Sequence, residues 1–232
     1  MTLNETTKPL VRPSSAVELD GRRILDIVVA GTALCALSPL FLALSMVIAI
    51  ESGTPIFFSQ IRIGKNGRPF SIYKFRKFKA SCDLNGYPLT LDRDERLTRV
   101  GRTLAASKLD ELPQLWNIFR GDMSVVGPRP ESITFNDCFH NGFEAILEHR
   151  PGLFGPCQVQ FRHESRLYPS DGSAADFYRE VLFPAKAKVD LAYFSHRTLV
   201  SDLRWIMRAI GVIAADVWAS KGRRNQANRP AE

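Results

Sequence analysis

The 232-residue sequence lacks the short motifs that mark several common functional classes. It has no GxxxxGK[ST] loop and no GxGxxG turn, which argues against the standard cradles for mononucleotides and dinucleotides. Its four histidines show no HExxH spacing and its four cysteines form no CxxC pair, so neither a zinc site nor a disulfide framework is expected. Such widely spaced cysteines favour a reducing compartment.

Acidic residues are outnumbered, with 24 against 31 lysines and arginines, and the formal net charge is +7. A basic chain suits an anionic partner such as nucleic acid, a membrane surface or a phosphorylated small molecule. No RNA- or DNA-binding motif accompanies the basic residues, so we expect no nucleic acid among the partners. The length favours one well-packed domain with an appendage.

Charge is nearly absent from residues 24–50, where Asp26 is the only charged residue. The segment is long enough for a transmembrane helix. Pro39 divides it, because proline removes a backbone donor and clashes with the preceding turn. Each half, 24–37 or 40–50, would be about 16–21 Å long, against about 30 Å for a bilayer core. The segment is therefore either a kinked spanning helix or a pair that enters and leaves one leaflet.

Both flanks of this segment are basic. Arg22 and Arg23 precede it, and residues 62–79 hold seven lysines and arginines with no acid. Cytoplasmic flanks of membrane segments are rich in Lys and Arg, and a spanning helix would place only one of these flanks in the cytoplasm. We therefore expect residues 21–51 to form a re-entrant, monotopic membrane anchor.

The remaining pattern predicts a small α+β domain that is mainly helical. The β-prone runs Ile56–Ile63 and Phe70–Phe75 flank an Asn-Gly turn, which predicts a basic hairpin beside the bilayer. Its cations either meet anionic lipid or, in the case of Lys74 and Arg76, face a phosphate pocket.

Helical spacing of leucines and aromatics follows over 109–119, with Ser107 as the expected N-cap and Gly121 as the C-terminal stop. Residues 183–218 predict a further helix, either in the core or amphipathic at the lipid interface. The other expected segments are a flexible tail at 1–20, a polar loop at 80–96, a helix at 132–149, an irregular loop at 151–156 and a basic polar tail at 221–232. Residues 52–220 would then form the cytoplasmic catalytic domain.

A reaction is indicated only by residues 109–131. Asp110 and Glu111 stand just before a proline-started helix, where the positive end of the helix dipole favours anions. Carboxylates bind Mg²⁺ together with substrate phosphates, and an aspartate can attack phosphorus. Adjacent acids at a helix start can equally well serve only to cap the helix.

Arg129 lies between Pro128 and Pro130, which stiffen the backbone around a guanidinium whose fork suits phosphate. The alternative to phosphate binding is that these residues form only a structural turn at the surface. Asp122 is either a third acid of the same site or a residue of the helix-end turn. Arg150 is a further phosphate-binding candidate, or the partner of a surface acid.

From about Arg22 to Ile213 the chain resembles the bacterial sugar transferases, also called monotopic phosphoglycosyl transferases. The resemblance is carried by five blocks: RRILDIVVA…LSPL, SGTPIFFSQIRIGKNGRPFSIYKFR, DERLTRVGRTL, LDELPQLWNIFRGDMSVVGPRP and RPGLFGPCQV. It implies transfer of a sugar 1-phosphate from a nucleotide sugar, usually UDP-linked, to polyprenol phosphate such as undecaprenyl phosphate. UMP leaves, and the lipid-linked sugar starts a glycan, as in exopolysaccharide or lipopolysaccharide synthesis.

The resemblance also implies roles and a location. Asp110 would carry the phosphosugar covalently, Glu111 would bind Mg²⁺, and Arg129 would hold phosphate. Lys74 and Arg76 match the YKFR motif of the family. The implied location is the cytoplasmic face of the bacterial inner membrane, with membrane lipid as a partner, and a homodimer remains an option.

The sequence departs from the family pattern near these motifs. Ala105 stands where many relatives have a basic residue, and Lys108 is a candidate substitute. The run KFRKF replaces a KFRSM-like run, and Phe154, Pro156 and Cys157 replace other residues in the RPG block. The sugar is therefore left open. Two rival interpretations also remain: direct transfer with Asp110 as a general base, and a membrane scaffold without catalysis.

Overall fold

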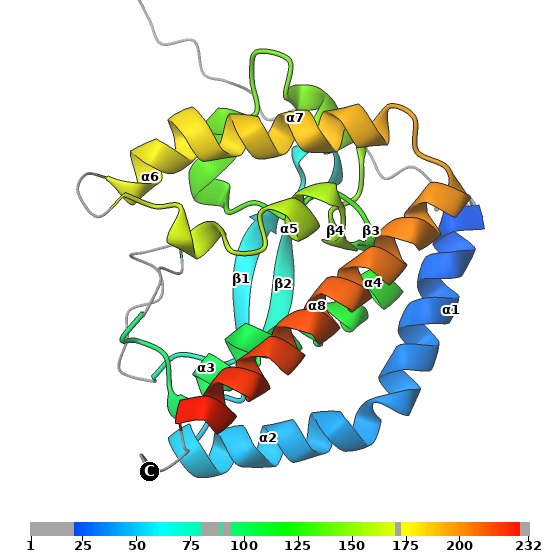
Figure 1. Ribbon diagram of the computed structural model, residues 1–232. Coiled ribbons are helices and arrows are strands. Elements are labelled where there is room, and N and C mark those ends of the chain that lie inside the picture. The colour runs from blue at the N-terminus through cyan, green and yellow to red at the C-terminus, as the bar shows by residue number, and fades with distance from the viewer. Residues whose placement is uncertain (1–20, 80–88, 90–93, 170–172, 228–232) are drawn as a thin grey trace, which may run out of the picture.

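The computed structural model describes residues 21–79, 89, 94–169 and 173–227. The expected tail at 1–20 and most of the expected loop at 80–96 lie outside these residues. The described chain is mostly helical and carries two small two-stranded sheets (Figure 1), which confirms the α+β class.

Two apolar helices begin the described chain. Helix α1 (Gly21–Ala36) and helix α2 (Ser38–Ser52) are bent by 60° at their junction. Pro39 lies in the first turn of α2, where its missing N–H costs no helical hydrogen bond. Among the described residues no single helix is long and apolar enough to cross a membrane, whereas the bent pair together has the length and composition of a broken span or a re-entrant loop.

The predicted hairpin is confirmed. Strands β1 (Phe57–Ile63) and β2 (Pro69–Phe75) pair antiparallel, from Phe57 opposite Phe75 to Ile63 opposite Pro69. The short 3₁₀ turn η1 (Lys65–Gly67) joins them. Asn66 and Gly67 there take positive φ values of 57° and 72°, which asparagine and glycine tolerate best.

The segment around the acid pair is divided differently from the prediction. Helix α3 (Arg99–Ser107) is followed by the 3₁₀ turn η2 (Leu109–Glu111) and helix α4 (Gln114–Arg120). The N-cap assignment of Ser107 was wrong, since it ends α3 and its hydroxyl donates to the carbonyls of Thr103 and Leu104. Lys108, whose φ is 61°, lies in the left-handed region. It ends α3 and separates that helix from the acid pair.

Two further predictions were wrong in detail. Residues 132–149 form two 3₁₀ segments, η3 (Ile133–Cys138) and η4 (Glu144–Glu148), and not one helix. The expected loop at 151–156 contains β4 (Gly152–Phe154), which pairs in parallel with β3 (Ser124–Val126). Side-chain periodicity gives no signal for strands of three residues, which depend on a partner far along the chain.

The C-terminal region is helical. It comprises α5 (Pro156–Gln160), η5 (Glu164–Arg166), α6 (Ala174–Phe177), a π-helical segment η6 (Tyr178–Leu182), α7 (Phe183–Phe194) and α8 (Leu199–Ala227). The expected single helix at 183–218 is thus two helices with a turn between them. The expected tail from residue 221 is helical as far as Ala227.

Helix α1 belongs to the core of the domain. Its residue Ala30 is fully buried in one cluster with Ile72 of the hairpin, Ile118 of α4 and Val125 of β3. A second cluster lies under α7 and gathers Phe135, Tyr178 and Phe183. Helix α4, which follows the acid pair, therefore packs directly on α1.

Charged side chains bind both ends of the bent pair to this domain. Arg23 donates to the carbonyls of Ile118 and Phe119 at the end of α4, at 2.6 and 2.7 Å. Asp26 accepts hydrogen bonds from the Ser124 hydroxyl at 2.9 Å and from the Val125 N–H at 2.8 Å.

At the other end, Arg76 donates to the carbonyls of Ser52 and Gly53, which close α2. The Glu51 carboxylate accepts a hydrogen bond from the N–H of Val100 in α3 at 3.0 Å. The start of α1 and the end of α2 are thus fixed to the same body.

We predict that Asp26→Ala destabilises the protein by about 2–4 kcal/mol, because it leaves two buried donors without an acceptor. At roughly 2–4 °C per kcal/mol for a chain of this size, the melting temperature in detergent should fall by about 5–15 °C. Asp26→Asn keeps an acceptor oxygen and should lose less. An unchanged melting temperature in Asp26→Ala would contradict this account of the tether.

Candidate active site

The turn η2 holds Asp110 and Glu111 at the centre of the domain. Asp110 is 1% exposed. Its Oδ2 lies 3.3 Å from Nζ of Lys77, whereas its Oδ1 is buried and has no hydrogen-bond partner within the part of the chain that the structure describes. A carboxylate oxygen buried in this way is costly unless a ligand or a donor satisfies it.

Glu111 is surrounded by cations. Nζ of Lys74 lies 3.4 Å and Nζ of Lys108 3.8 Å from its Oε1. Burial alone would raise the pKa of Glu111, but Lys74, Lys108 and Arg129 outweigh it and hold that pKa well below its usual range. Glu111 is therefore an anion at neutral pH. For Lys74, burial outweighs Glu111 and lowers the pKa to about 8, so the ammonium is still mostly charged there.

Acidic side chains hold Arg129 in place. Its Nη2 lies 3.9 Å from a carboxylate oxygen of Glu164, and the opposite oxygen of Glu164 pairs with Lys186 at 3.1 Å. Lys186 is 3% exposed and also contacts Glu131 and the hydroxyl of Tyr178. Burial would lower the pKa of Arg129, but Glu164 and Glu111 raise it above its usual value. The guanidinium thus keeps its charge and is fixed in direction.

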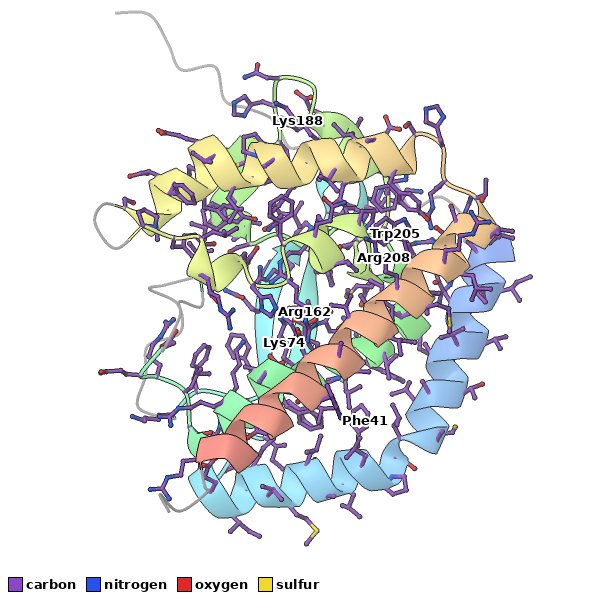
Figure 2. The ribbon with its side chains drawn as sticks, viewed as in Figure 1. Phe41, Lys74, Arg162, Lys188, Trp205 and Arg208 are labelled. Atoms are coloured by element: carbon purple, nitrogen blue, oxygen red, sulfur yellow. The ribbon has the colours of Figure 1, made fainter. Side chains whose placement is uncertain are left out.

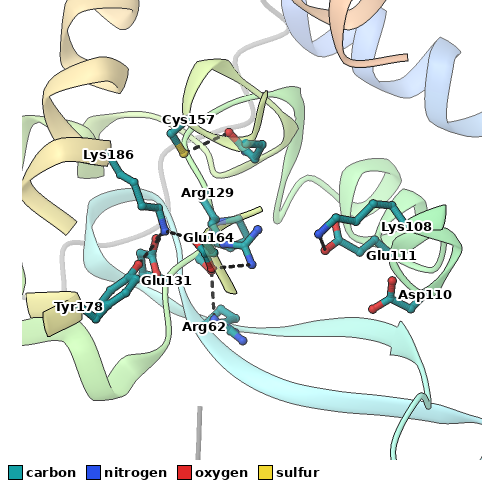
Figure 3. Close-up of polar contacts among 12 residues, drawn as sticks. Arg62, Lys108, Asp110, Glu111, Arg129, Glu131, Cys157, Glu164, Tyr178 and Lys186 are labelled. Atoms are coloured by element: carbon teal, nitrogen blue, oxygen red, sulfur yellow. Dashed lines mark hydrogen bonds and ion pairs between the residues drawn. The ribbon is translucent and has the colours of Figure 1, made fainter. Parts of the chain in front are cut away.

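Figure 3 shows these groups on two sides of an opening. Glu164, Lys186 and Arg129 lie on one side, and Glu111 with Lys108 and Asp110 on the other. The opening is part of a cavity of about 220 Å³ between η2, α5 and α8, which Lys108, Glu111 and Arg129 all line. A phosphate between Arg129 and Lys108 would lie next to the acid pair.

The predicted site residues are only partly brought together. Lys108, Glu111 and Arg129 share the cavity wall, Lys74 contacts Glu111, and Asp110 is adjacent in the same turn. Lys74 belongs to β2, whereas Arg76 lies one residue beyond the end of that strand, and the two side chains have different partners. The contacts of Arg76 are with the end of α2.

Asp122 and Arg150 do not line the cavity. Oδ2 of Asp122 accepts a hydrogen bond from the Asn117 amide and lies 3.6 Å from Nε of Arg120, an arrangement typical of a helix-end turn. Arg150 does not line the cavity, and its carbonyl lies against Gly127. Within the described residues no three His, Cys, Asp or Glu side chains gather to hold a metal.

Lys77 is a site residue that sequence reasoning missed, as it also missed Glu164 and Lys186 beside Arg129. Lys77 was counted among the basic residues at 62–79 and stands in the altered KFRKF run, but nothing in the sequence indicated that it meets Asp110. The contact depends on the hairpin folding against η2, which lies more than thirty residues along the chain.

The sequence model of one family, described as bacterial sugar transferase, matches residues 18–216. The chain belongs to this family. The match includes the hairpin, the acid pair, Arg129 and most of α8, so the cavity lies wholly within it.

Characterised relatives of this sugar transferase are named for related reactions. A UDP-glucose:undecaprenyl-phosphate glucose-1-phosphate transferase from Caulobacter vibrioides is 35% identical over 85% of this chain and 71% of its own length. A UDP-N-acetylgalactosamine-undecaprenyl-phosphate N-acetylgalactosaminephosphotransferase from Aeromonas hydrophila is 42% identical, over 60% of this chain and 33% of its own length.

The exopolysaccharide production protein PSS of Rhizobium leguminosarum is 33% identical over 87% of this chain and 97% of its own length. This chain thus spans only a third of the Aeromonas relative but nearly all of the Rhizobium one. The relatives are named for different sugars, so similarity alone does not select one.

The departures from the family pattern lie close to the cavity. Lys108, Phe154 and Cys157 line it, and Pro156 begins α5 beside it. Lys108 contacts Glu111, so it supplies a cation to the acid pair from the position just before η2.

We predict that Lys77→Ala slows sugar-phosphate transfer by about 10- to 100-fold, because it leaves a buried carboxylate without its cation, at a cost of roughly 1–3 kcal/mol. Initial rates at saturating substrate would measure this. Lys77→Arg should recover part of the rate. The matched control is Lys79→Ala, two residues away and exposed. A wild-type rate in Lys77→Ala would rule out a positioning role for Lys77.

Proposed function

We propose that this protein transfers a sugar 1-phosphate from a UDP-linked sugar to undecaprenyl phosphate at the membrane, as the first step of a glycan pathway. The observation that carries the proposal is the turn that holds the buried Asp110 next to Glu111: Glu111 and Lys108 line one side of a cavity, and Arg129 lines the other. Relatives named for this reaction cover most of the chain and support it.

The reaction proceeds in two displacements. A carboxylate oxygen of Asp110 attacks the phosphorus that bears the sugar, the bond from that phosphorus to the bridging oxygen breaks, and UMP leaves with the bonding electrons. A phosphate oxygen of the lipid then attacks the same phosphorus and releases Asp110 as a carboxylate. The product is polyprenyl diphosphate sugar, and the enzyme regains its starting state.

The alternative is direct transfer with Asp110 as a general base. A general base is of little use here, because the attacking group is the lipid phosphate. The second pKa of a phosphate monoester is about 6, so this group is already largely ionised at neutral pH. The unpartnered oxygen of Asp110 is better suited to a nucleophile. Splitting the transfer also means that the aqueous donor and the lipid acceptor need not be bound together.

Magnesium fits the acid pair. Mg²⁺ takes one or two carboxylates and completes its shell with water and substrate phosphates. Glu111 is the group that would hold it, because the free oxygen of Asp110 is needed for the attack on phosphorus; Asp122, the other predicted ligand, pairs with Arg120 instead. When bound, the ion neutralises charge on the diphosphate. The cations of the site, Arg129, Lys74 and Lys108, hold the phosphates in place for attack.

We further propose that α1 and α2 form a re-entrant anchor at the cytoplasmic face. A bent pair that spans a bilayer has its two ends on opposite sides. Here Arg23 binds the start of α1 to α4, and Arg76 binds the end of α2 to the hairpin. Attachment of both ends to one domain supports a segment that enters and returns.

Asp110→Asn should abolish turnover and leave membrane association unchanged, because an amide is a very poor nucleophile. With radiolabelled UDP-sugar and no acceptor, the wild type should release about one UMP per enzyme and retain label on Asp110, detectable by mass spectrometry. Asp137→Asn, at an exposed acid, is the control. Strict dependence of UMP release on both substrates would favour direct displacement, and full activity in Asp110→Ala would favour a scaffold.

The anchor predicts a labelling pattern. Single cysteines at exposed positions beyond residue 51, such as Lys65 in the hairpin turn, should react with a membrane-impermeant thiol reagent in inside-out vesicles only. Cys35, Cys82, Cys138 and Cys157 would first be replaced by serine or alanine. Labelling of the hairpin from the periplasmic side would show that the pair spans the membrane.

A further inference from the structure

We propose that the cavity between η2, α5 and α8 binds the first isoprenoid units of the lipid acceptor, with Ala209, Val212 and Ile213 of α8 as one wall. This inference rests on the proposed function and assigns the acceptor to one part of the site. It separates a hydrocarbon subsite from the region of the acid pair, where the phosphates react.

The lining of the cavity is mainly apolar. Its hydrocarbon side chains come from four elements and their connections: Leu109, Leu112, Leu153, Phe154, Val159, Phe161, Val212 and Ile213. An apolar cavity of roughly 150 Å³ in a protein core binds benzene. A cavity of about 220 Å³ therefore has room for one or two five-carbon isoprene units.

The charged lining residues make the cavity suited to an amphipathic ligand. Lys108 and Arg129 line the same cavity as these apolar side chains, and Glu111 lies between them and Asp110. A phosphate with a hydrocarbon chain matches this distribution, because its anion meets the cations while its first carbons enter the apolar part. The phosphate would then lie beside the carboxylate that we propose carries the phosphosugar.

Polar groups deeper in the cavity are already bonded. The amide of Gln158 donates to the carbonyls of Gly127 and Gly152. Arg162 pairs with Asp216 of α8, and Lys186 with its two glutamates. A nucleobase or sugar would have to break such bonds to satisfy its own donors and acceptors, whereas a hydrocarbon requires none. This favours the isoprenoid over the donor as the occupant.

Helix α8 also offers a route to lipid. It has apolar side chains on a second, exposed face, with Leu203, Met207 and Ile210 each about half exposed or more. A helix that is apolar on two sides borders two apolar environments. Helix α8 packs on α3, α5, β3 and β4. The remainder of the lipid chain can leave the cavity past α8 toward the bilayer.

The test is Ile213→Trp, which fills the cavity, with Lys188→Trp at an exposed position of α7 outside the cavity lining (Figure 2) as the control. Two acceptors are compared in detergent: undecaprenyl phosphate and the short, water-soluble geranyl phosphate. We expect Ile213→Trp to raise KM at least tenfold for both acceptors, while KM for the UDP-sugar and UMP release without acceptor change less than twofold. Lys188→Trp should change neither acceptor KM.

Other outcomes overturn the inference. A raised KM for the UDP-sugar with unchanged acceptor KM would assign the cavity to the donor. A loss confined to undecaprenyl phosphate would indicate a contact with long lipid at the surface, and unchanged kinetics would exclude the cavity altogether. If Ile213→Trp does not fold, the smaller change Val212→Phe takes its place. A wild type that releases no UMP and transfers no sugar would refute the proposed function itself, and not merely this subsite.

Discussion

The cost of placing two adjacent carboxylates together, one buried and one partly buried, governs the centre of this structure. Asp110 and Glu111 are held in a single turn, and a buried anion is stable only when cations and donors replace the water it loses. Lys77 and Lys74 reach the pair from the hairpin, and Lys108 from the preceding turn. The hairpin therefore contributes charge as well as packing. The same cations are suited to a diphosphate, so the groups that stabilise the pair also prepare the site for its substrate.

A second set of charges joins the two apolar N-terminal helices to this centre. The sequence presents Arg23 as a flanking charge and Asp26 as an isolated charge in an apolar run. In the fold both are buried, and they bind the end of α4 and the start of β3. A charge inside an apolar helix is expensive unless it is paired. Here hydrogen bonds to α4 and β3 satisfy both charges and hold the helices in place relative to the acid pair.

Sequence reasoning succeeded where the signal was local. The hairpin followed from β-prone runs and an Asn-Gly turn, and the break between α1 and α2 followed from Pro39. It failed where contacts over long distances decided the outcome. Ser107 was assigned as the N-cap of the helix expected at 109–119, but the positive φ of Lys108 ends the previous helix there. Arg76 was grouped with Lys74 by motif, yet the two side chains bind different parts of the fold.

The sequence by itself determined the α+β class, the bent apolar segment, and the acid pair and clamped arginine as the candidate site. These depend on residue type and on short spacings, which act through local backbone preferences and chemistry. Only the tertiary structure decided which cations meet the acids, that Asp122 lies apart from them, and that α8 closes an apolar cavity beside them. Burial and pairing are properties of distant segments brought together, so no pattern along a single stretch of chain can specify them.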